Sequence, residues 1–314
     1  MGSGVLFTLG ARGSPLALAQ AREARRLLAL AHGWDEQNVA IRVIRTSGDL
    51  IRDRPLAEAG GKGLFTKEID AALLAGQIDA AVHSAKDLPT RLPEGVAIAG
   101  CLEREDARDA LISSIADSIL SLPHGARLGT ASLRRRAQAR RLRPDLRVEL
   151  LRGNVETRLG KAESGAIDAT LLALAGLKRL GLAHRATAVL DIETFLPAVG
   201  QGAVALTARS ADARSLAALA AIGHADTFVA LSAERAFLAE LEGSCRTPIA
   251  GYARLAGAAL VLTGQALRED GSEGFDVRVS GAPADAARLG AEAGRDLRRR
   301  LPPGVLAAGE GPAR

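Results

Sequence analysis

The chain contains one pattern twice, and this duplication limits the folds that it can adopt. LGARGSPLALAQAR (9–22) shares its beginning and end with LGTASLRRRAQAR (128–140), and each is typical of a strand, a small polar loop and a helix. Residues 75–88 and 164–177 then match in the same order through the pattern GxIDA, and each indicates a helix end, a turn and a buried strand. Two matches in one order predict a duplicated α/β lobe.

Alternating strand and helix signals predict a mainly parallel sheet in each lobe, with helices on both faces. In open sheets of this kind, loops at the carboxyl ends of the strands build the ligand site. Those loops are ARGS, HSAKD, GTAS and LRGN. The segment LPAVGQGAVALTAR (196–209) is punctuated by Pro and Gly, and we expect it to return the chain to the first lobe.

The texture of the sequence changes near residue 225. An amphipathic helix is followed by three strand-like segments, a hairpin turn at REDGSEG and a closing helix. We therefore expect an α/β protein in three parts. These are a first lobe at 1–102 and 203–221, a second lobe with hinge segments at 103–202, and a smaller C-terminal α+β domain at 222–314.

Arginine is concentrated in residues 129–154, where the predicted helix begins with three in a row, Arg134 to Arg136. Arginine near a helix N-terminus faces the positive end of the backbone dipole. Arg136 and Arg140, four residues apart, also repel each other. A sequence that accepts both costs is expected to bind an anion, and the net charge of +5 permits a polyanionic partner.

The kind of anion can be narrowed from the residues. Grooves for single-stranded nucleic acid interleave aromatic side chains, but the one Trp, one Tyr and six Phe all lie outside 129–154. The AGGKGLF segment lacks the spacing and the Ser/Thr of a phosphate-binding P-loop. Carboxylates remain, because the planar fork of arginine can donate two parallel hydrogen bonds to one carboxylate.

Two further places could carry chemistry. Lys86 and Asp87 stand at the end of a predicted strand, where the carboxylate could stabilise a developing cation and shuttle protons; an ordinary surface ion pair is the alternative. Cys245 follows a helix end beside Arg246, which would lower the pKa of its thiol. Cys101 in IAGCL fits a buried, inert cysteine better.

Other sequence features concern the cellular location of the protein and the role of its cysteines. No apolar run approaches the ~18 residues that cross a bilayer, and the N-terminus lacks the parts of a signal peptide. We therefore expect a cytoplasmic protein. The two cysteines lie far apart and without a nearby histidine cluster, so neither a disulfide framework nor a metal site is expected.

Together these residues resemble the porphobilinogen deaminase family, also called hydroxymethylbilane synthase. The matching segments run in order from about residue 8 to 253. They are ARGSPLALAQA, GGKGLFTKEID, AVHSAKDLPT, CLEREDARDALIS, GTASLRRRAQ, LRGNVETRLGK, LAGLKRLGL, LPAVGQGAV and EGSCRTPIAGY.

The resemblance implies a transferase of tetrapyrrole (haem and porphyrin) biosynthesis. Such enzymes join four porphobilinogen molecules head to tail, release ammonia at each addition and produce linear hydroxymethylbilane. They carry a dipyrromethane cofactor bound by a thioether to a cysteine, which here would be Cys245. The catalytic aspartate of the family matches Asp87, which would stabilise the methylene-pyrrolenine cation and later help to remove a proton.

The resemblance also implies two lobes like those of periplasmic binding proteins and a set of binding residues. The expected cofactor-binding residues are Ser84, Lys86, Thr130, Ser132, Arg134, Arg135 and Arg158. The expected substrate-binding residues are Arg12, Ser14, Arg152 and Arg179. A bound carboxylate would then relieve the unfavourable position of the arginines at the helix start. The implied partner is the small molecule porphobilinogen, with neither nucleic acid nor membrane, and the implied state is a monomer.

Three positions depart from the usual pattern of the family. Glu58 stands where lysine is frequent, Ser244 where a second glycine is common, and Arg246 where an uncharged residue is frequent. The alternatives to an enzyme are a two-lobed binding module, for which Cys245 would be unnecessary, and a nucleic-acid-binding protein, whose affinity would fall steeply with salt.

Overall fold

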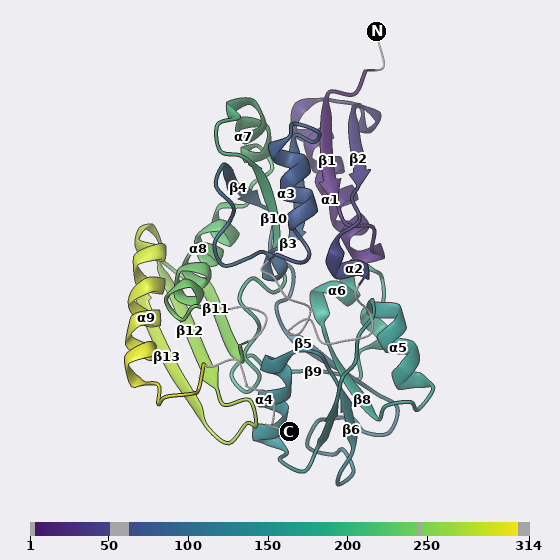
Figure 1. The fold of residues 1–314 in the computed structure, drawn as a ribbon, viewed down its shortest axis with the longest axis vertical. Helices are drawn as coiled ribbons and strands as arrows, with labels where there is room; N and C mark the ends of the chain where they lie inside the picture. Colours follow the sequence, from purple (N-terminus) through teal and green to yellow (C-terminus); the bar gives the residue numbers. More distant parts are fainter. Residues whose placement is uncertain (1–3, 51–62, 244–246, 307–314) are drawn as a thin grey trace.

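The computed structural model describes residues 4–50, 63–243 and 247–306 and arranges them in three parts (Figure 1). Two parts are lobes built on five-stranded sheets, and the third combines helices with a three-stranded sheet. The predicted α/β class, with two lobes and a smaller C-terminal α+β unit, is therefore confirmed.

The first sheet has the strand order β2-β1-β3-β10-β4. β1 is parallel to β2 and β3, whereas β10 is antiparallel to β3 and β4. The strands are β1 (Phe7–Ala11), β2 (Val39–Val43), β3 (Ala80–Ser84), β4 (Val96–Cys101) and β10 (Val204–Arg209). The helices are α1 (Pro15–His32), α2 (Ser47–Leu50), α3 (Lys67–Leu74) and α7 (Ala213–Ala220), with 3-10 turns η1 (Glu36–Asn38) and η2 (Ala85–Asp87).

The second sheet repeats this arrangement in the order β7-β6-β8-β5-β9. β6 is parallel to β7 and β8, whereas β5 is antiparallel to β8 and β9. The strands are β5 (Asp109–Ser113), β6 (Arg127–Gly129), β7 (Arg147–Glu149), β8 (Ala169–Ala173) and β9 (Ala188–Val189). The helices are α4 (Leu133–Leu142), α5 (Val155–Glu163) and α6 (Leu174–Arg179), with a 3-10 turn η3 (Ala183–Arg185).

The prediction of mainly parallel sheets misses one antiparallel strand in each lobe, β10 in the first and β5 in the second. Both strands lie where the chain has just crossed between the lobes. Parallel neighbours require a crossover connection, usually a helix. A strand that arrives from the other lobe has no such connection to its neighbours, so it is free to run in the opposite direction.

Each of the two lobes contains an equivalent polar contact between an aspartate carboxylate and a backbone amide. The carboxylate of Asp79 accepts a hydrogen bond from the Thr8 amide at 2.7 Å, and that of Asp168 accepts one from the Arg127 amide at 2.7 Å. Both aspartates belong to the repeated GxIDA pattern. The duplication read from the sequence is therefore also present in the contacts of the two sheets.

The first helix of each lobe begins in the same way. The Ser14 hydroxyl accepts a hydrogen bond from the Ala17 amide at the start of α1, and the Ser132 hydroxyl accepts one from the Arg135 amide at the start of α4, both at 3.3 Å. Serine is a favoured N-cap because its oxygen satisfies an amide that has no partner inside the helix. These caps fix the helix starts just beyond the polar loops.

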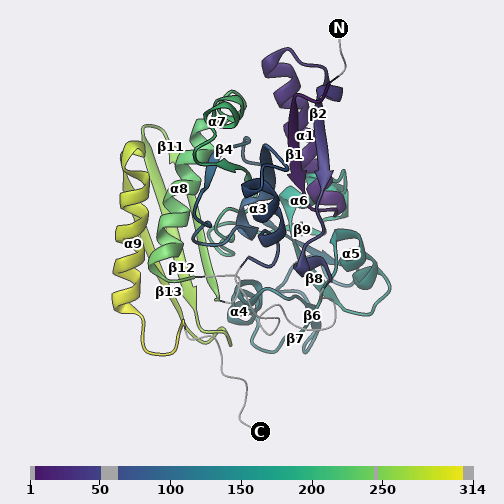
Figure 2. The same ribbon diagram turned by 45° about the horizontal axis from the view of Figure 1, so that its top comes forward.

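In the third part, two helices lie side by side against the sheet (Figures 1 and 2). They pack closely because a Cβ on Gly290 would lie 2.0 Å from the Ala233 carbonyl oxygen, and one on Gly294 would lie 2.7 Å from that of Phe237. The elements are α8 (Ala225–Glu240), β11 (Ile249–Ala256), β12 (Ala259–Leu267), β13 (Gly274–Gly281), a 3-10 turn η4 (Pro283–Asp285) and α9 (Ala286–Arg300). Each strand is antiparallel to the next, as expected from the hairpin signal.

Among the described residues, no single helix is long and apolar enough to cross a membrane. Helices α7 and α8 taken together have the length and apolar composition of a membrane span, but the chain bends by 115° between them.

Candidate active site

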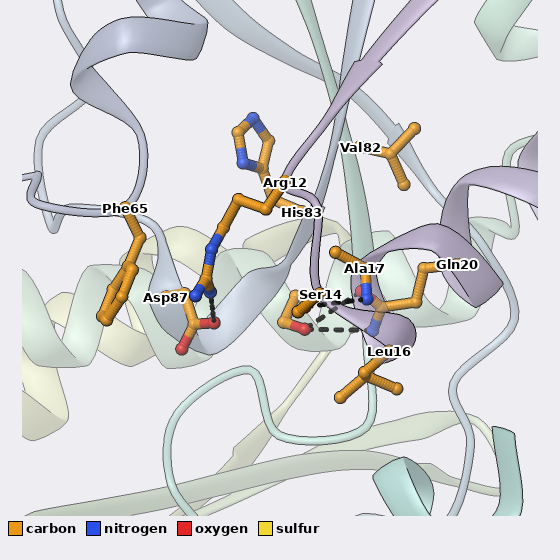
Figure 3. A pocket seen from close by; sticks show the side chains of 10 residues that line it. Arg12, Ser14, Leu16, Ala17, Gln20, Phe65, Val82, His83 and Asp87 are labelled. Carbon is orange, nitrogen blue, oxygen red and sulfur yellow. Dashed lines mark hydrogen bonds and ion pairs between the residues drawn. The ribbon is translucent and has the colours of Figure 1, made fainter. Parts of the chain in front are cut away.

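The loops that follow β1 and β3 meet at a small cavity of about 50 Å³ in the first lobe (Figure 3). The predicted residues Arg12, Ser14, Ser84 and Asp87 all line it. The sheet order explains this meeting, because β1 and β3 are parallel neighbours and their carboxyl ends lie at the same edge.

Arg12 lies between an aromatic ring and a carboxylate. Its guanidinium carbon is 4.1 Å from the centre of the Phe65 ring, and its Nη1 is 3.7 Å from Asp87 Oδ2 (Figure 3). Stacking on Phe65 keeps the planar group in place beside the carboxylate. The Asp87 side chain remains 32% exposed, so one partner is in place while the carboxylate stays accessible to a ligand.

Two neighbouring cations have lowered pKa values. Burial and the charge of Arg135 lower the pKa of Lys86 to about 8, against the opposing effect of Asp87 and Asp109. Burial and the charges of Arg135 and Arg152 lower the pKa of Arg158 to about 10, although Asp87 opposes this. The two lobes therefore contribute charges to one electrostatic site.

This charge distribution fits a ligand with several carboxylates. Six cations belong to this site: Arg12, which lines the cavity, Lys86 and Arg158, whose pKa values are lowered, and Arg134, Arg135 and Arg152, whose charges help to lower them. Asp87 and Asp109 are the carboxylates that act on Lys86 and Arg158, so among the described residues of this site the cations outnumber the carboxylates. Bringing anions into such a cluster lowers the mutual repulsion of its cations. The residues present thus suit a polycarboxylate cofactor or substrate.

The first arginines of α4 are bound to a carboxylate of the protein itself. Asp109 is fully buried and accepts a hydrogen bond from Arg134 Nη2 at 2.8 Å and two from Arg135, from Nη2 at 2.7 Å and from Nε at 3.0 Å. Burial alone would raise the pKa of Asp109, but the two guanidinium groups hold it down at about 2. Asp109 therefore stays ionised and compensates the arginines at the helix start.

This arrangement changes one expectation from the sequence. A bound carboxylate was expected to relieve the unfavourable position of Arg134 and Arg135, whereas Asp109 already does so. Further along α4, Arg136 pairs with Glu269 in the third domain at 2.8 Å. The arginine run is thus divided between an internal carboxylate, an interdomain contact and the electrostatic site.

The other predicted residues take different places. Thr130 is buried, its hydroxyl accepts a hydrogen bond from the Ser132 amide at 3.1 Å, and Ser132 caps α4. Arg179 lies outside the cavity, with its Nε 3.4 Å from Glu23 and its Nη1 3.1 Å from the Gly202 carbonyl oxygen.

The cysteines and the three departures from the family pattern are only partly described. Cys245, Ser244, Arg246 and Glu58 lie outside the described residues. Cys101 is fully buried, and burial raises the pKa of its thiol to about 12, as expected for an inert cysteine. Within the described part of the chain, no group of three or more His, Cys, Asp or Glu side chains is arranged to hold a metal ion.

Sequence reasoning missed several residues of the site. Asp109 and Gln201 are both fully buried, and His83 and Gln20 line the cavity. A signal existed for Asp109, because a charged residue at the start of the apolar strand DALIS needs a buried partner. Gln201 stands between two glycines in the segment that crosses between the lobes, and nothing local in the sequence indicates its partners.

Fold and site together define a two-lobed α/β protein in which cations of both lobes surround a carboxylate, a charge distribution that suits an anionic ligand. The family model described as "Porphobilinogen deaminase, dipyromethane cofactor binding domain" matches residues 7–217, and "Porphobilinogen deaminase, C-terminal domain" matches residues 228–299. The chain therefore belongs to the porphobilinogen deaminase (hydroxymethylbilane synthase) family of transferases, and its matched first region is the domain that binds the dipyrromethane cofactor.

Individual relatives agree with this assignment. The chain is 57% identical over 296 residues to porphobilinogen deaminase of Nitrobacter hamburgensis and 58% identical over 296 residues to that of Nitrobacter winogradskyi, with 94% of each chain covered in both cases. Among solved structures, the chain matches the methionine-binding protein MetQ at 13% identity and a TM-score of 0.44, over 68% of this chain and 88% of that one. A periplasmic substrate-binding protein from Coxiella burnetii matches at 15% identity and a TM-score of 0.44, over 69% and 92%.

Proposed function

We propose that this chain condenses four porphobilinogen molecules head to tail into linear hydroxymethylbilane, with release of ammonia, on a dipyrromethane primer attached through a thioether to Cys245. Membership of the family supports the reaction. The observation that carries the proposal is the excess of cations around the partly exposed carboxylate of Asp87. Each porphobilinogen brings an acetate and a propionate, so the growing product adds two negative charges at every step.

Asp87 is proposed as the catalytic residue. Its carboxylate can stabilise the positive charge that develops when the substrate loses its amine, and it can accept the proton that leaves the substituted ring. Arg12, held on Phe65, orients this carboxylate. The dipyrromethane, when bound, supplies the pyrrole position to which the first substrate is added.

The remaining site residues are proposed to bind carboxylates or to shape the loops that do so. The proposed cofactor-binding set is Ser84, Lys86, Thr130, Ser132, Arg134, Arg135 and Arg158, and the proposed substrate-binding set is Arg12, Ser14, Arg152 and Arg179. Charge interactions among Lys86, Arg135 and Arg158 support the grouping of the first set. For Arg179, a substrate carboxylate would compete with Glu23.

We further propose the division into a first lobe at 1–102 and 203–221, a second lobe at 103–202 and a third domain at 222–314. The place of β10 inside the first sheet supports this division. We also propose that the protein is a cytoplasmic monomer that binds neither nucleic acid nor membrane. The small-molecule chemistry of the site and the scarcity of aromatic residues support this view.

Intact-mass measurement followed by peptide mapping tests the attachment site. We expect the mass of a dipyrromethane on the peptide that contains Cys245, and its loss in Cys245→Ser. Cys101→Ser is the matched control, because the chain has two cysteines and Cys101 is buried. A wild-type chain that stays unmodified after incubation with porphobilinogen would contradict the proposal.

A further inference from the structure

A Gly-Gln-Gly turn is wedged between the two lobes. Gly200 and Gly202 have φ values of 74° and 88°, which favour glycine. A Cβ on Gly200 would lie 3.0 Å from the backbone nitrogen of Lys86, and one on Gly202 would lie 2.2 Å from the Glu105 carbonyl oxygen. The turn thus fits against η2, which carries Lys86, on one side and against the segment that enters the second lobe on the other.

The side chain between these glycines has a fixed orientation. Gln201 is fully buried, and its Nε2 donates hydrogen bonds to the Ala107 carbonyl oxygen at 2.7 Å and to Asp109 Oδ1 at 3.1 Å. Both amide hydrogens therefore have acceptors. The opposite orientation would place the amide oxygen against two acceptors. As a result Oε1 must face Lys86 Nζ, which lies 3.4 Å away.

We infer that Gln201 is a positioning residue that holds the Lys86 ammonium group at the site and connects it to the Asp109 cluster of the second lobe. It would act through Lys86 without touching a reacting atom itself. The inference deepens the proposed function, because the group that Lys86 presents is the one proposed to bind a ligand carboxylate.

The charges around Lys86 explain why such an acceptor matters. Arg134 and Arg135 face it from α4 and disfavour its charged form. Asp109 at the start of β5 and Asp87 in η2 favour that form. Because its pKa is lowered to about 8, the protonation of Lys86 near neutral pH is sensitive to each neighbour. The oxygen of Gln201 is the uncharged acceptor in this set, and it stabilises the ammonium form.

The test follows the titration of Lys86 by NMR in the full-length chain carrying ¹³Cε-labelled lysine. The chain has only five lysines, at positions 62, 67, 86, 161 and 178, and Lys86→Arg assigns the signal. Gln201→Met removes the acceptor, so we expect the pKa of Lys86 to fall by about 0.5. Gln201→Glu adds a negative charge beside Lys86, so we expect the pKa to rise by about 1 or more. Its second oxygen replaces Nε2 and meets the Ala107 carbonyl oxygen and Asp109 Oδ1, so we also expect this variant to lose stability.

The opposite directions distinguish positioning from a general loss of packing, which would move both variants the same way. Gln138→Met is the matched control, because Gln138 is also buried and donates to a carbonyl oxygen, that of Leu196. In this control the Lys86 titration should not change. If Gln201→Met does not fold, Gln201→Asn, whose shorter amide cannot span the same gap, takes its place with the same expected fall.

Porphobilinogen consumption separates the two proposals. We expect Gln201→Met to raise KM several-fold with a smaller change in kcat, since binding of a carboxylate weakens. A Lys86 titration that is unchanged, or that shifts in the same direction in both variants, would overturn the role of Gln201 even in an active enzyme. A wild-type chain that consumes no porphobilinogen would instead overturn the proposed function and leave the titration result standing.

Discussion

The two lobes share a scaffold but divide the chemistry between them. The strand orders correspond, yet β3 leads into Lys86 and Asp87, whereas β8 leads into the buried apolar start of α6 at Leu174. Conversely, the arginines at a helix start belong to α4 of the second lobe. The two lobes thus share their strand pairing, whereas the side chains at the carboxyl ends of corresponding strands differ.

Removal of the carboxylate that only the first lobe carries should have the largest effect. We expect Asp87→Ala to lower the rate of porphobilinogen consumption by about 10²–10⁴-fold, the range typical for loss of a proton-transfer group. Thermal unfolding should change little, since the side chain is 32% exposed.

The control for this variant is Asp145→Ala in the second lobe, where Asp145 pairs with Arg143 at 2.7 Å on a surface loop. It should lower stability without slowing turnover. Undiminished consumption by Asp87→Ala would show that the chemistry does not depend on the charged end of β3.

The next largest effect concerns the carboxylate of the second lobe. Asp109→Asn leaves Arg134 and Arg135 buried with a weaker acceptor, and breaking such a buried pair costs about 3–5 kcal/mol. Urea unfolding should show this loss. Glu36→Gln, which breaks the exposed Arg25–Glu36 pair in the first lobe, should cost less than about 1 kcal/mol. Equal losses in both variants would mean that Asp109 does not compensate the arginines.

The sequence predicts those features that depend on residues close together in the chain, and it does not predict those that depend on distant segments. Ser14 and Ser132 indicate the starts of their helices from local sequence alone. The GxIDA repeat corresponds to one contact between an aspartate and a backbone amide inside each lobe. Lys86 and Asp87 follow from their place at a strand end. The meeting of Asp109 with Arg135 depends on the order in which distant strands pair, and periodicity carries no information about that order.

A similar limit applies to the antiparallel strands and to Gln201. Strand signals give the length and burial of β5 and β10 but not their direction, which depends on where the chain comes from. The partners of Gln201 come from both lobes, so they become visible only once the two crossing segments lie side by side. The Arg12–Phe65 stack is likewise a contact between segments that the sequence separates by the whole of α1 and β2.

A fall in pH should lower the stability of the first lobe through one buried residue of β3 that has no counterpart in β8. His83 in β3 is buried, and burial together with the charge of Arg12 lowers its pKa to about 4. The unfolded chain, with a pKa near 6.5, then binds the proton first, so stability is full above pH ~6.5 and falls as the pH drops toward 4. The repeat aligns His83 with Leu172 of β8.

His83→Leu therefore gives the first lobe the residue of the second. We expect it to remove up to about 3 kcal/mol of the stability change between pH 6.5 and 4. Urea unfolding at several pH values measures this difference. An unchanged pH dependence would mean that other groups govern acid unfolding and that His83 does not set the lobes apart.

The smallest expected effects test the scaffold that the lobes share. A Cβ on Gly10 would lie 2.3 Å from Ile78 Cδ1, and one on Gly129 would lie 2.7 Å from Ile167 Cδ1, so the same glycine–isoleucine contact occurs in both lobes. Substitution by alanine should cost about 1–2 kcal/mol at each site through overpacking. The cost should be greater at Gly129, because Leu151 Cβ lies 3.0 Å away and, unlike the end of a side chain, cannot rotate aside.

Gly160→Ala provides the reference for these two variants. Gly160 lies inside α5 with no neighbouring atom within 4 Å of a new Cβ, so alanine there should stabilise the protein by about 0.5–1 kcal/mol. Urea unfolding of the three variants then separates backbone entropy from packing. A stabilising result at Gly10 together with a destabilising one at Gly129 would show that the repeated sequence no longer serves the same packing role in both lobes.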